Sequence, residues 1–227
     1  MEIADKKIQL SPSKLGLFLE CPLCFWLQEV KGIHRPSGPF SSLPSGMDFL
    51  IKKYFDKYRA LGKMPPEIEG KVQGQLFSDQ RLLARWRHWR TGLRFEDKNL
   101  NAVLLGALDE CFVDGRFYIP VDYKTRGFEL KEDSLSYYQT QLDCYTLLLE
   151  KNGYEHPSFG YLIYYIPEKV GENGLAKFKV EPHKLETDPE HGYKIFCEAL
   201  KLLRGPQPAS HSECQFCSWG TDFPNVQ

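Results

Sequence analysis

Two aspartates and a lysine gather in one short stretch of the sequence. Residues 106–125 read GALDECFVDGRFYIPVDYKT and contain Asp109, Asp122 and Lys124. Carboxylates are good ligands for Mg²⁺ and Mn²⁺. The three side chains could therefore be gathered to hold a metal ion, or they could line the solvated face of an ordinary hairpin.

The Asp-Gly dipeptide in the middle of this stretch is typical of a two-residue hairpin turn. If the residues that flank it pair, Asp109 lies opposite Pro120 and is the diagonal neighbour of Asp122. Lys124 then falls on the same face of the hairpin. Diagonal Cβ atoms are about 7 to 8 Å apart, so two carboxylates could share one ion. Pro120 cannot donate to the ladder and is a candidate position for a bulge that would shift this pairing.

Apolar residues occupy both faces of the predicted hairpin. They are Leu104, Leu105, Ala107, Leu108, Phe112, Ile119 and Val121. This pattern indicates strands that are covered on both sides, where unpaired carboxylates would be costly to bury. A bound cation would supply the counter-charge, so the surroundings favour a metal centre over a solvated hairpin.

Four of the seven cysteines form two CxxC pairs near opposite ends of the chain. The pairs are Cys21 with Cys24 and Cys214 with Cys217. Two such pairs can supply four thiolates to a zinc ion or to an iron-sulfur cluster. Disulfides are less expected in a reducing compartment, and the other three cysteines are isolated and read as small core residues.

The elements around these residues indicate one α/β (α+β) domain with a mixed central β-sheet flanked by helices. The predicted helices span residues 12–30, 46–61, 78–93, 133–150 and 188–203, and the predicted strands span residues 101–113, 116–125, 159–167 and 176–182. We expect a single domain over residues 1–227. It would have a helical N-terminal part over 11–95, a core over about 100–182 and a cysteine tail over 205–227.

A basic segment with two tryptophans, RLLARWRHWRTGLR, begins at residue 81. On a helix, two of its arginines and its histidine would share one face and could follow phosphates, and the tryptophans could stack on bases. The alternative is an amphipathic helix with buried tryptophans and solvated arginines. Two adjacent lysines further upstream form a smaller basic spot. The candidate nucleic-acid contacts are Arg81, Arg85, Trp86, His88, Trp89, Lys52 and Lys53.

The composition is that of an ordinary globular protein. Hydrophobic residues make up 42% of the 227 residues, and 29 Lys and Arg nearly balance 30 Asp and Glu. The balance means that a nucleic-acid site would have to be a local basic patch. No apolar run is long enough to cross a bilayer and the N-terminus has no signal-like segment, so we expect a cytoplasmic protein with no membrane partner.

The order GALD, hairpin, VDYKT resembles the acidic core of the PD-(D/E)xK nuclease superfamily, which has a restriction-endonuclease-like fold. The YKT continuation resembles its RecB-like branch, which carries a QxxxY motif on the following helix. Gln141 and Tyr145 stand at the matching positions and are four residues apart, so they share one helix face. The resemblance covers nearly the whole chain from the first CxxC pair to the second.

The resemblance implies that Asp109, Asp122 and the backbone carbonyl of Tyr123 bind Mg²⁺ or Mn²⁺. Lys124 would orient or polarise the attacking water, or would neutralise charge that develops on the phosphate. Gln141, together with Tyr145 on the same helix face, would help to position the water or the phosphodiester.

One position departs from the family pattern. Many relatives place a His or an acidic ligand on an upstream helix after a glycine, whereas the matching region here, LPSGMDFLIKKYFD, has no His. Asp48 is the nearest candidate metal ligand. Its alternative role is that of an acidic residue in the first turn of a helix.

The resemblance also bears on the cysteines. RecB-like nucleases of the AddB type, and the iron-sulfur nucleases of CRISPR adaptation, hold a cluster between cysteines before and after the nuclease core. Many of them use one N-terminal and three C-terminal cysteines, whereas this chain has two and two. A [4Fe-4S] cluster that staples the two ends together is the expectation, and Zn²⁺ is the alternative.

Together these features predict a Mg²⁺- or Mn²⁺-dependent deoxyribonuclease, with exonuclease action in DNA repair, recombination or CRISPR adaptation. The expected substrate is DNA with single-stranded character, and the expected protein partner is a helicase or an integrase. The alternative is a non-catalytic, zinc-stabilised nucleic-acid-binding module of a larger repair assembly. The intact set of Asp109, Asp122 and Lys124 argues against that alternative, and no oligomeric state is predicted.

Overall fold

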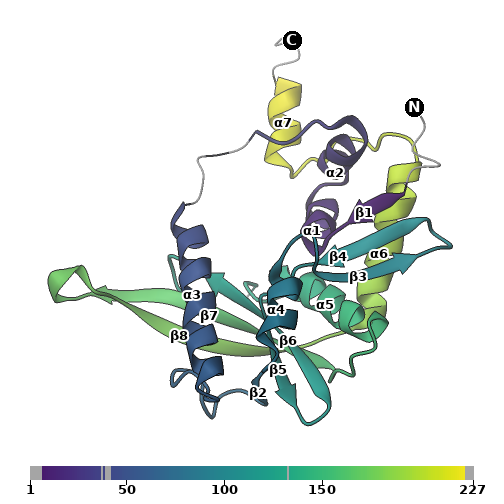
Figure 1. Cartoon of the computed structure of the whole chain (residues 1–227). Helices are drawn as coiled ribbons and strands as arrows, with labels where there is room; N and C mark the ends of the chain where they lie inside the picture. Colours follow the sequence, from purple (N-terminus) through teal and green to yellow (C-terminus); the bar gives the residue numbers. More distant parts are fainter. Residues whose placement is uncertain (1–6, 37, 39–41, 132, 223–227) are drawn as a thin grey trace.

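The computed structural model describes residues 7–36, 38, 42–131 and 133–222 (Figure 1). The α-helices are α1 (Pro12–Glu20), α2 (Pro22–Trp26), α3 (Ser42–Ala60), α4 (Gln80–Arg87), α5 (Gln139–Lys151), α6 (Pro189–Arg204) and α7 (Gln215–Asp222). Short π- and 3₁₀-helical turns are η2 (Leu27–Lys31), η3 (Ser136–Tyr138) and η4 (Glu172–Gly174). The strands are β1 (Ile8–Leu10), β2 (Gln75–Leu76), β3 (Leu93–Asp97), β4 (Ala102–Gly106), β5 (Glu110–Asp114), β6 (Phe117–Thr125), β7 (Phe159–Val170) and β8 (Ala176–Glu186).

The strands form two sheets. The larger sheet has the order β2-β5-β6-β7-β8, and the smaller one has the order β1-β4-β3. In the larger sheet β6 and β7 are parallel and are joined through α5, while the other neighbours are antiparallel. The predicted mixed sheet with flanking helices and a strand-helix-strand unit is therefore confirmed.

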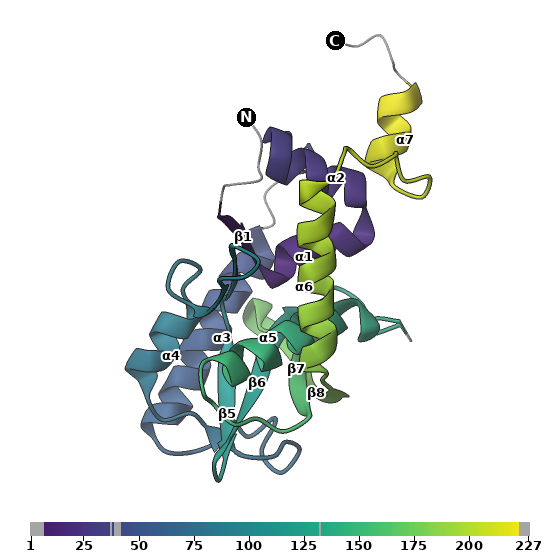
Figure 2. The ribbon, with the colours of Figure 1, turned by 90° about the vertical axis from the view of Figure 1, so that its right-hand side faces the viewer.

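Helices cover both faces of the larger sheet. Alternate residues of β6 point to opposite sides, so Val121 and Tyr123 pack with Phe55 of α3 in one cluster. On the other face α5 packs over the sheet and α6 packs on α5, with Leu142 of α5 and Tyr164 of β7 among the buried residues of this layer. Figure 2 shows α6 lying across α5 and reaching up toward α2 and α7. The candidate residues Asp122 and Lys124, both in β6, therefore lie in the middle layer between these helices.

The predicted first helix is interrupted at its CxxC pair. Ser11 caps α1 through its hydroxyl, and the helix ends at Cys21, which is extended with φ −156° and ψ 103°. Pro22 then starts α2. A residue before proline avoids the helical region, and proline lacks the donor that would continue α1, so the chain turns at this point.

The predicted bounds of one helix and one strand are also wrong. The predicted helix over 78–93 ends at Arg87, because His88 is extended and the following residues lead into β3. The predicted strand over 101–113 is two strands, β4 and β5, which belong to different sheets. The three residues between them, 107–109, carry the chain from one sheet to the other.

The β7–β8 hairpin extends well beyond the body of the molecule at the left of Figure 1. The predicted strand over 159–167 is the inner part of β7, whereas the predicted strand over 176–182 begins at the tip of the hairpin and forms the outer part of β8. Among the described residues, no helix combines the length and the apolar character needed to cross a membrane.

Candidate active site

The β5–β6 hairpin turns one residue later than predicted. Gly115 occupies the first loop position with φ 58°, a left-handed conformation that favours glycine. The pairing is regular through Pro120, which lies opposite Cys111, so no bulge occurs there. Continued by one position, this register puts Asp109 opposite Asp122. The two carboxylates are therefore direct cross-strand neighbours on one face, and not diagonal ones.

The segment that carries Asp109 is held by hydrogen bonds on each of its three residues. The Tyr145 hydroxyl donates to the carbonyl of Ala107 at 2.8 Å, and the amide of Leu108 donates to a carbonyl of α4 at 3.0 Å. Arg87 Nε donates to the carbonyl of Asp109 at 2.7 Å. Helices α4 and α5 thus fix the backbone where the chain passes between the two sheets.

The residues of the DxK and QxxxY motifs meet around one carboxylate. Gln141 Nε2 donates to Asp122 Oδ1 at 2.8 Å and to the Tyr145 hydroxyl at 2.8 Å. Gln141 Oε1 accepts from Lys124 Nζ at 2.9 Å, and that ammonium lies 2.5 Å from Asp122 Oδ2. The spacing of four residues on α5 therefore presents the amide and the hydroxyl to the same group, as the helix geometry predicts.

The surroundings of Asp122 disfavour its ionised form. It is only 2% exposed, and burial, followed by the nearby Asp109, raises its pKa to about 7, against the opposing effect of Lys124. Among the residues that the structure describes, its Oδ2 atom has no neutral hydrogen-bond donor, and its only close contact is the Lys124 ammonium at 2.5 Å. A buried carboxylate oxygen in this condition, beside a second carboxylate, has the donor chemistry that suits a hard divalent cation.

Asp109 is contacted from both sides. Its Oδ1 atom lies 2.7 Å from Lys52 Nζ, and its Oδ2 atom accepts from the amide of Tyr123 at 3.3 Å. The N–H and C=O of a strand residue leave the chain on the same side, so the Tyr123 carbonyl also points toward the Asp109 side of β6. The carbonyl is thus in the direction expected for a backbone ligand.

Lys52 connects Asp109 to α3. Its ammonium also lies 2.8 Å from Asp48, four residues earlier on the same helix. Burial opposes the charged form of Lys52, but the two carboxylates outweigh it and raise the pKa of the amine. The predicted upstream ligand is therefore near the acidic centre and is joined to it through a lysine that the sequence had suggested for a surface basic spot.

A buried ion network lies directly behind the site. Glu110 is fully buried, and its carboxylate contacts Arg59 at 2.5 Å and Arg87 at 3.0 Å. The Tyr123 hydroxyl donates to the same carboxylate at 3.0 Å, and both arginines contact Asp56. Sequence reasoning missed this network. Its signal was an acidic residue inside an apolar strand, which needs a buried cationic partner.

The candidate nucleic-acid residues divide into buried and exposed ones. Trp86 is 4% exposed and its ring stacks on a core phenylalanine with 5.2 Å between centroids, so it is not available to bases. Trp89 is 65% exposed. Arg81 and Arg85 are exposed on α4, but His88 caps the helix in an extended conformation and does not continue their face.

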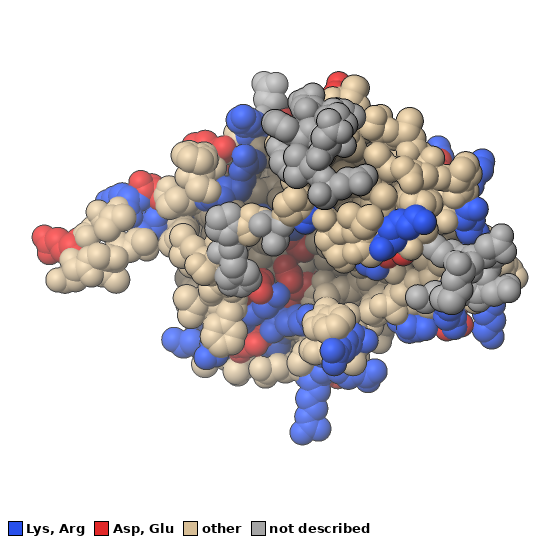
Figure 3. All heavy atoms as spheres, turned by 90° about the horizontal axis from the view of Figure 1, so that it is seen from above, with Lys and Arg blue, Asp and Glu red and all other residues tan. Residues whose placement is uncertain are grey.

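Seen from above, the molecule has a hollow near its middle with acidic side chains at the floor and basic side chains beside them (Figure 3). This surface agrees with a recessed acidic centre whose carboxylates are largely covered, Asp109 by 81% and Asp122 by 97% of their side-chain area. An anionic substrate would meet the basic side chains before it reaches the carboxylates.

The two CxxC pairs meet where α2 and α7 come together at the top of Figure 1. The sulfurs of Cys21 and Cys217 are 3.5 Å apart, and Cys24 Sγ lies 3.7 Å from Cys214 Sγ. All four sulfurs lie within 4.8 Å of one another, so they could hold a metal ion as predicted. Arg35 Nη2 donates to Cys214 Sγ at 3.5 Å. Burial opposes the thiolate of Cys214, but backbone amides and the other thiols outweigh it and lower its pKa to about 6.

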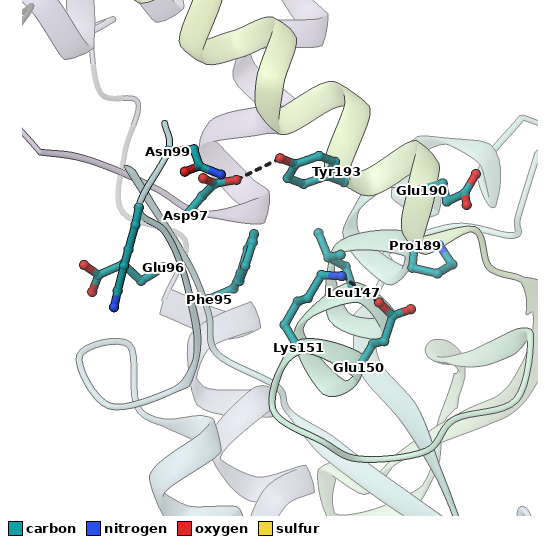
Figure 4. A pocket seen from close by; sticks show the side chains of 11 residues that line it. Phe95, Glu96, Asp97, Asn99, Leu147, Glu150, Lys151, Pro189, Glu190 and Tyr193 are labelled. Carbon is teal, nitrogen blue, oxygen red and sulfur yellow. Dashed lines mark hydrogen bonds and ion pairs between the residues drawn. The ribbon is translucent and has the colours of Figure 1, made fainter. Parts of the chain in front are cut away.

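A separate cavity of about 940 Å³ lies between β3, α5 and α6 (Figure 4). Acidic and basic side chains mix around it, and its most buried carboxylate, Asp97, accepts a hydrogen bond from the Tyr193 hydroxyl at 2.8 Å. Lys151 pairs with Glu150 beside it. None of its lining residues belongs to the acidic centre, so this cavity is not the predicted active site.

Comparison with known proteins agrees with the geometry. The family model of the PD-(D/E)XK nuclease superfamily matches residues 52–221. A solved structure described as "Crystal structure of SSO0001" shares the fold at 13% sequence identity and a TM-score of 0.50, over 96% of this chain and 86% of that one. No curated protein matches the sequence. The family model matches three quarters of the chain, and the matched part contains the acidic centre. The chain therefore belongs to the PD-(D/E)XK nuclease superfamily.

Proposed function

We propose that the protein is a Mg²⁺- or Mn²⁺-dependent nuclease that hydrolyses DNA phosphodiester bonds at the Asp109–Asp122 centre. The observation that carries the proposal is the shared site of two neighbouring carboxylates and Lys124, joined by Gln141. The family supports a nuclease, and the substrate DNA and the choice of metal are our inference.

The chain's own residues suggest a division of work. Asp109, Asp122 and the Tyr123 carbonyl would hold the metal, which when bound would neutralise phosphate charge and lower the pKa of its water. Lys124 is restrained by Gln141 and by the ring of Tyr138, 4.0 Å below its ammonium. A lysine held in this way can stabilise negative charge on the phosphate without first having to be ordered.

The arrangement of Gln141 supports a positioning role. Its amide contacts Asp122, Lys124 and Tyr145 at once, so it fixes the distance between a metal ligand and the cationic side chain. The Tyr145 hydroxyl is anchored in turn on the Ala107 carbonyl. We infer that this chain of contacts keeps Asp122 and Lys124 in one geometry while the substrate enters.

Exposed aromatic rings support a substrate with single-stranded character. Trp89, Phe49, Phe128 and Tyr137 are between 57% and 83% exposed. Unpaired bases have free faces that can stack on such rings. From the family resemblance we further propose exonuclease action in DNA repair, recombination or CRISPR adaptation, beside a helicase or an integrase.

The test is cleavage of end-labelled single- and double-stranded DNA with Mg²⁺ or Mn²⁺. Wild-type protein should cut, and Asp122→Asn should reduce the rate at least a hundredfold, because one misplaced or missing catalytic contact commonly costs about that much. Asp114→Asn is the matched control, since Asp114 is an exposed aspartate in the turn of the same hairpin. Equal cutting by wild type and Asp122→Asn would remove the proposed centre.

Two extensions of this assay distinguish an exonuclease from an endonuclease, and a nuclease from a non-catalytic binding module. Substrates with blocked 5′ or 3′ ends should resist an exonuclease and remain open to an endonuclease. Wild-type protein that binds DNA tightly but leaves every substrate intact would instead identify the non-catalytic binding module.

We further propose that the four cysteines hold one Zn²⁺ ion. Four sulfurs around zinc, each about 2.3 Å from the ion, form a tetrahedron with edges of about 3.8 Å. Three sulfur–sulfur contacts of 3.5, 3.7 and 4.0 Å, in a set whose members all lie within 4.8 Å of one another, support that size. Each thiolate of a [4Fe-4S] cluster binds a different iron, so its sulfurs lie farther apart. The separations therefore favour zinc over the cluster expected from the resemblance.

A further inference from the structure

We propose that Lys52 is an exchangeable counter-ion of Asp109, which a divalent metal displaces and which then binds the substrate phosphodiester. The proposal rests on the proposed nuclease function and adds a residue and an order of events to it. It starts from the position of the ammonium, which lies inside the acidic centre at 2.7 Å from Asp109 Oδ1.

In the described structure each of the two carboxylates proposed as metal ligands already contacts one lysine. Lys52 contacts Asp109, and Lys124 contacts Asp122. With Asp48 counted as well, three carboxylates and two ammonium groups give a net charge of −1 when all five are ionised. A divalent ion would change this sum to +1, and a phosphodiester, which carries −1, would bring it to zero. With metal and substrate both bound, the charges of the site therefore sum to zero only if both lysines stay nearby.

The metal and the ammonium cannot both remain on Asp109. A metal ion bound to the Asp109 carboxylate would be a close neighbour of the ammonium that now contacts this carboxylate at 2.7 Å, and two neighbouring cations repel strongly in a partly buried site. The lysine side chain is flexible and can retract without a change of the helix. Displacement of Lys52 is therefore the expected response to metal binding.

Asp48 determines where the displaced ammonium goes. It stands one helical turn before Lys52 on α3 and already contacts the ammonium at 2.8 Å. Its side chain is 43% exposed, whereas that of Asp109 is 19% exposed, so Asp48 lies nearer the surface. Lys52 would remain tethered at the edge of the acidic centre, where an incoming phosphate passes.

An ordinary structural salt bridge is the competing explanation for the same contact. It predicts that loss of Lys52 would leave Asp109 with the Tyr123 amide as its partner and would not tighten metal binding. The exchange proposal predicts opposite effects on two ligands, because the ammonium competes with the metal and attracts the phosphate.

Two binding measurements test the exchange. Mn²⁺ binding to DNA-free protein, followed by calorimetry, should be about tenfold tighter in Lys52→Met than in wild type, since one competing positive charge is gone. Binding of a single-stranded oligonucleotide with Ca²⁺ in place of Mn²⁺ should be weakened about tenfold in the same variant. Lys52→Gln is a second neutral variant, should Lys52→Met not fold. Lys52→Arg keeps the charge and should bind Mn²⁺ no tighter than wild type.

Lys57→Met is the matched control. Lys57 is an exposed lysine of the same helix α3 and lies outside the acidic centre, so its loss should leave Mn²⁺ binding unchanged. Unchanged or weaker Mn²⁺ binding in both neutral Lys52 variants would overturn the exchange. The proposed function fails separately, if wild type and Asp122→Asn bind the same amount of Mn²⁺.

Discussion

Arg59 and Glu110 form an ion pair that solvent scarcely reaches. Arg59 Nη2 contacts both carboxylate oxygens at 2.5 Å, and the two side chains are 3% and 0% exposed. The pair joins α3 to β5 at the residue directly after Asp109. The same network that stabilises the packing of the helix therefore also fixes the backbone of a candidate metal ligand.

Removal of one partner of this pair should be strongly destabilising. Glu110→Ala removes the buried carboxylate that Arg59 and Arg87 share and leaves Asp56 as their remaining acidic partner, and the expected loss is about 3 to 5 kcal/mol in the free energy of unfolding. Urea denaturation measures it. Glu155→Ala is the control, because it breaks an ion pair with Arg116 whose side chains are 57% and 72% exposed, and its midpoint should scarcely move. A Glu110→Ala midpoint equal to that of wild type would contradict the network.

The hairpin illustrates which features local sequence can predict. Its existence follows from a turn signal between two apolar runs, and the shared face of Asp109 and Asp122 survives because the true register differs from the predicted one by an even number of residues. The predicted loop is one residue too early, because a glycine can occupy either the first or the second position of such a turn. Which position it takes depends on the geometry of the flanking strands.

The residues that reach the site from other helices could not be predicted from local sequence. Lys52 and Arg87 come from α3 and α4, and each lies in a segment for which the sequence indicates basic surface residues. Each points inward because its helix packs against a strand end that carries a carboxylate or a free carbonyl. Such contacts depend on the angle between helix and sheet, which no local pattern encodes. The CxxC pairs were easier, because their spacing alone implies a common metal.

Asp122 should make the metal-free protein less stable as the pH rises. Its pKa of about 7 in the folded chain exceeds the value of about 3.9 expected when unfolded. Between these values the folded chain keeps a proton that the unfolded chain has lost. The contribution is thus fully present below about pH 4 and is lost as the pH rises through 7, at no more than about 1.4 kcal/mol per pH unit.

Urea denaturation at several pH values between 4 and 8, without added divalent metal, measures this slope. Asp122→Asn cannot titrate, so its stability should fall less steeply than that of wild type over the same range. Asp114→Asn, in the exposed turn, should keep the wild-type slope. Parallel curves for wild type and Asp122→Asn would show that Asp122 is ionised throughout, against the expectation from its burial.

The cysteine site should contain one zinc ion per chain and should stabilise the protein. Anaerobically purified protein is expected to be colourless, and a strong chelator should lower its melting temperature, because metal-binding energy contributes to folding. Cys24→Ser should lose the zinc, whereas Cys197→Ser, outside the cluster, should retain it. Brown protein with broad absorbance near about 400 nm would instead identify an iron-sulfur cluster.

The two tryptophans at the end of α4 should separate stability from substrate binding. Trp86→Ala empties part of the core, where its ring stacks on Phe77, and should cost about 3 to 5 kcal/mol in the free energy of unfolding. Trp89→Ala removes an exposed ring and should leave the urea midpoint in place. If bases stack on Trp89, however, its loss should weaken single-stranded oligonucleotide binding in Ca²⁺ by about 1 to 3 kcal/mol. Unchanged oligonucleotide binding in Trp89→Ala would exclude this ring from the substrate path, and the exposed rings beside α3 and α5 would then be the remaining candidates for base stacking.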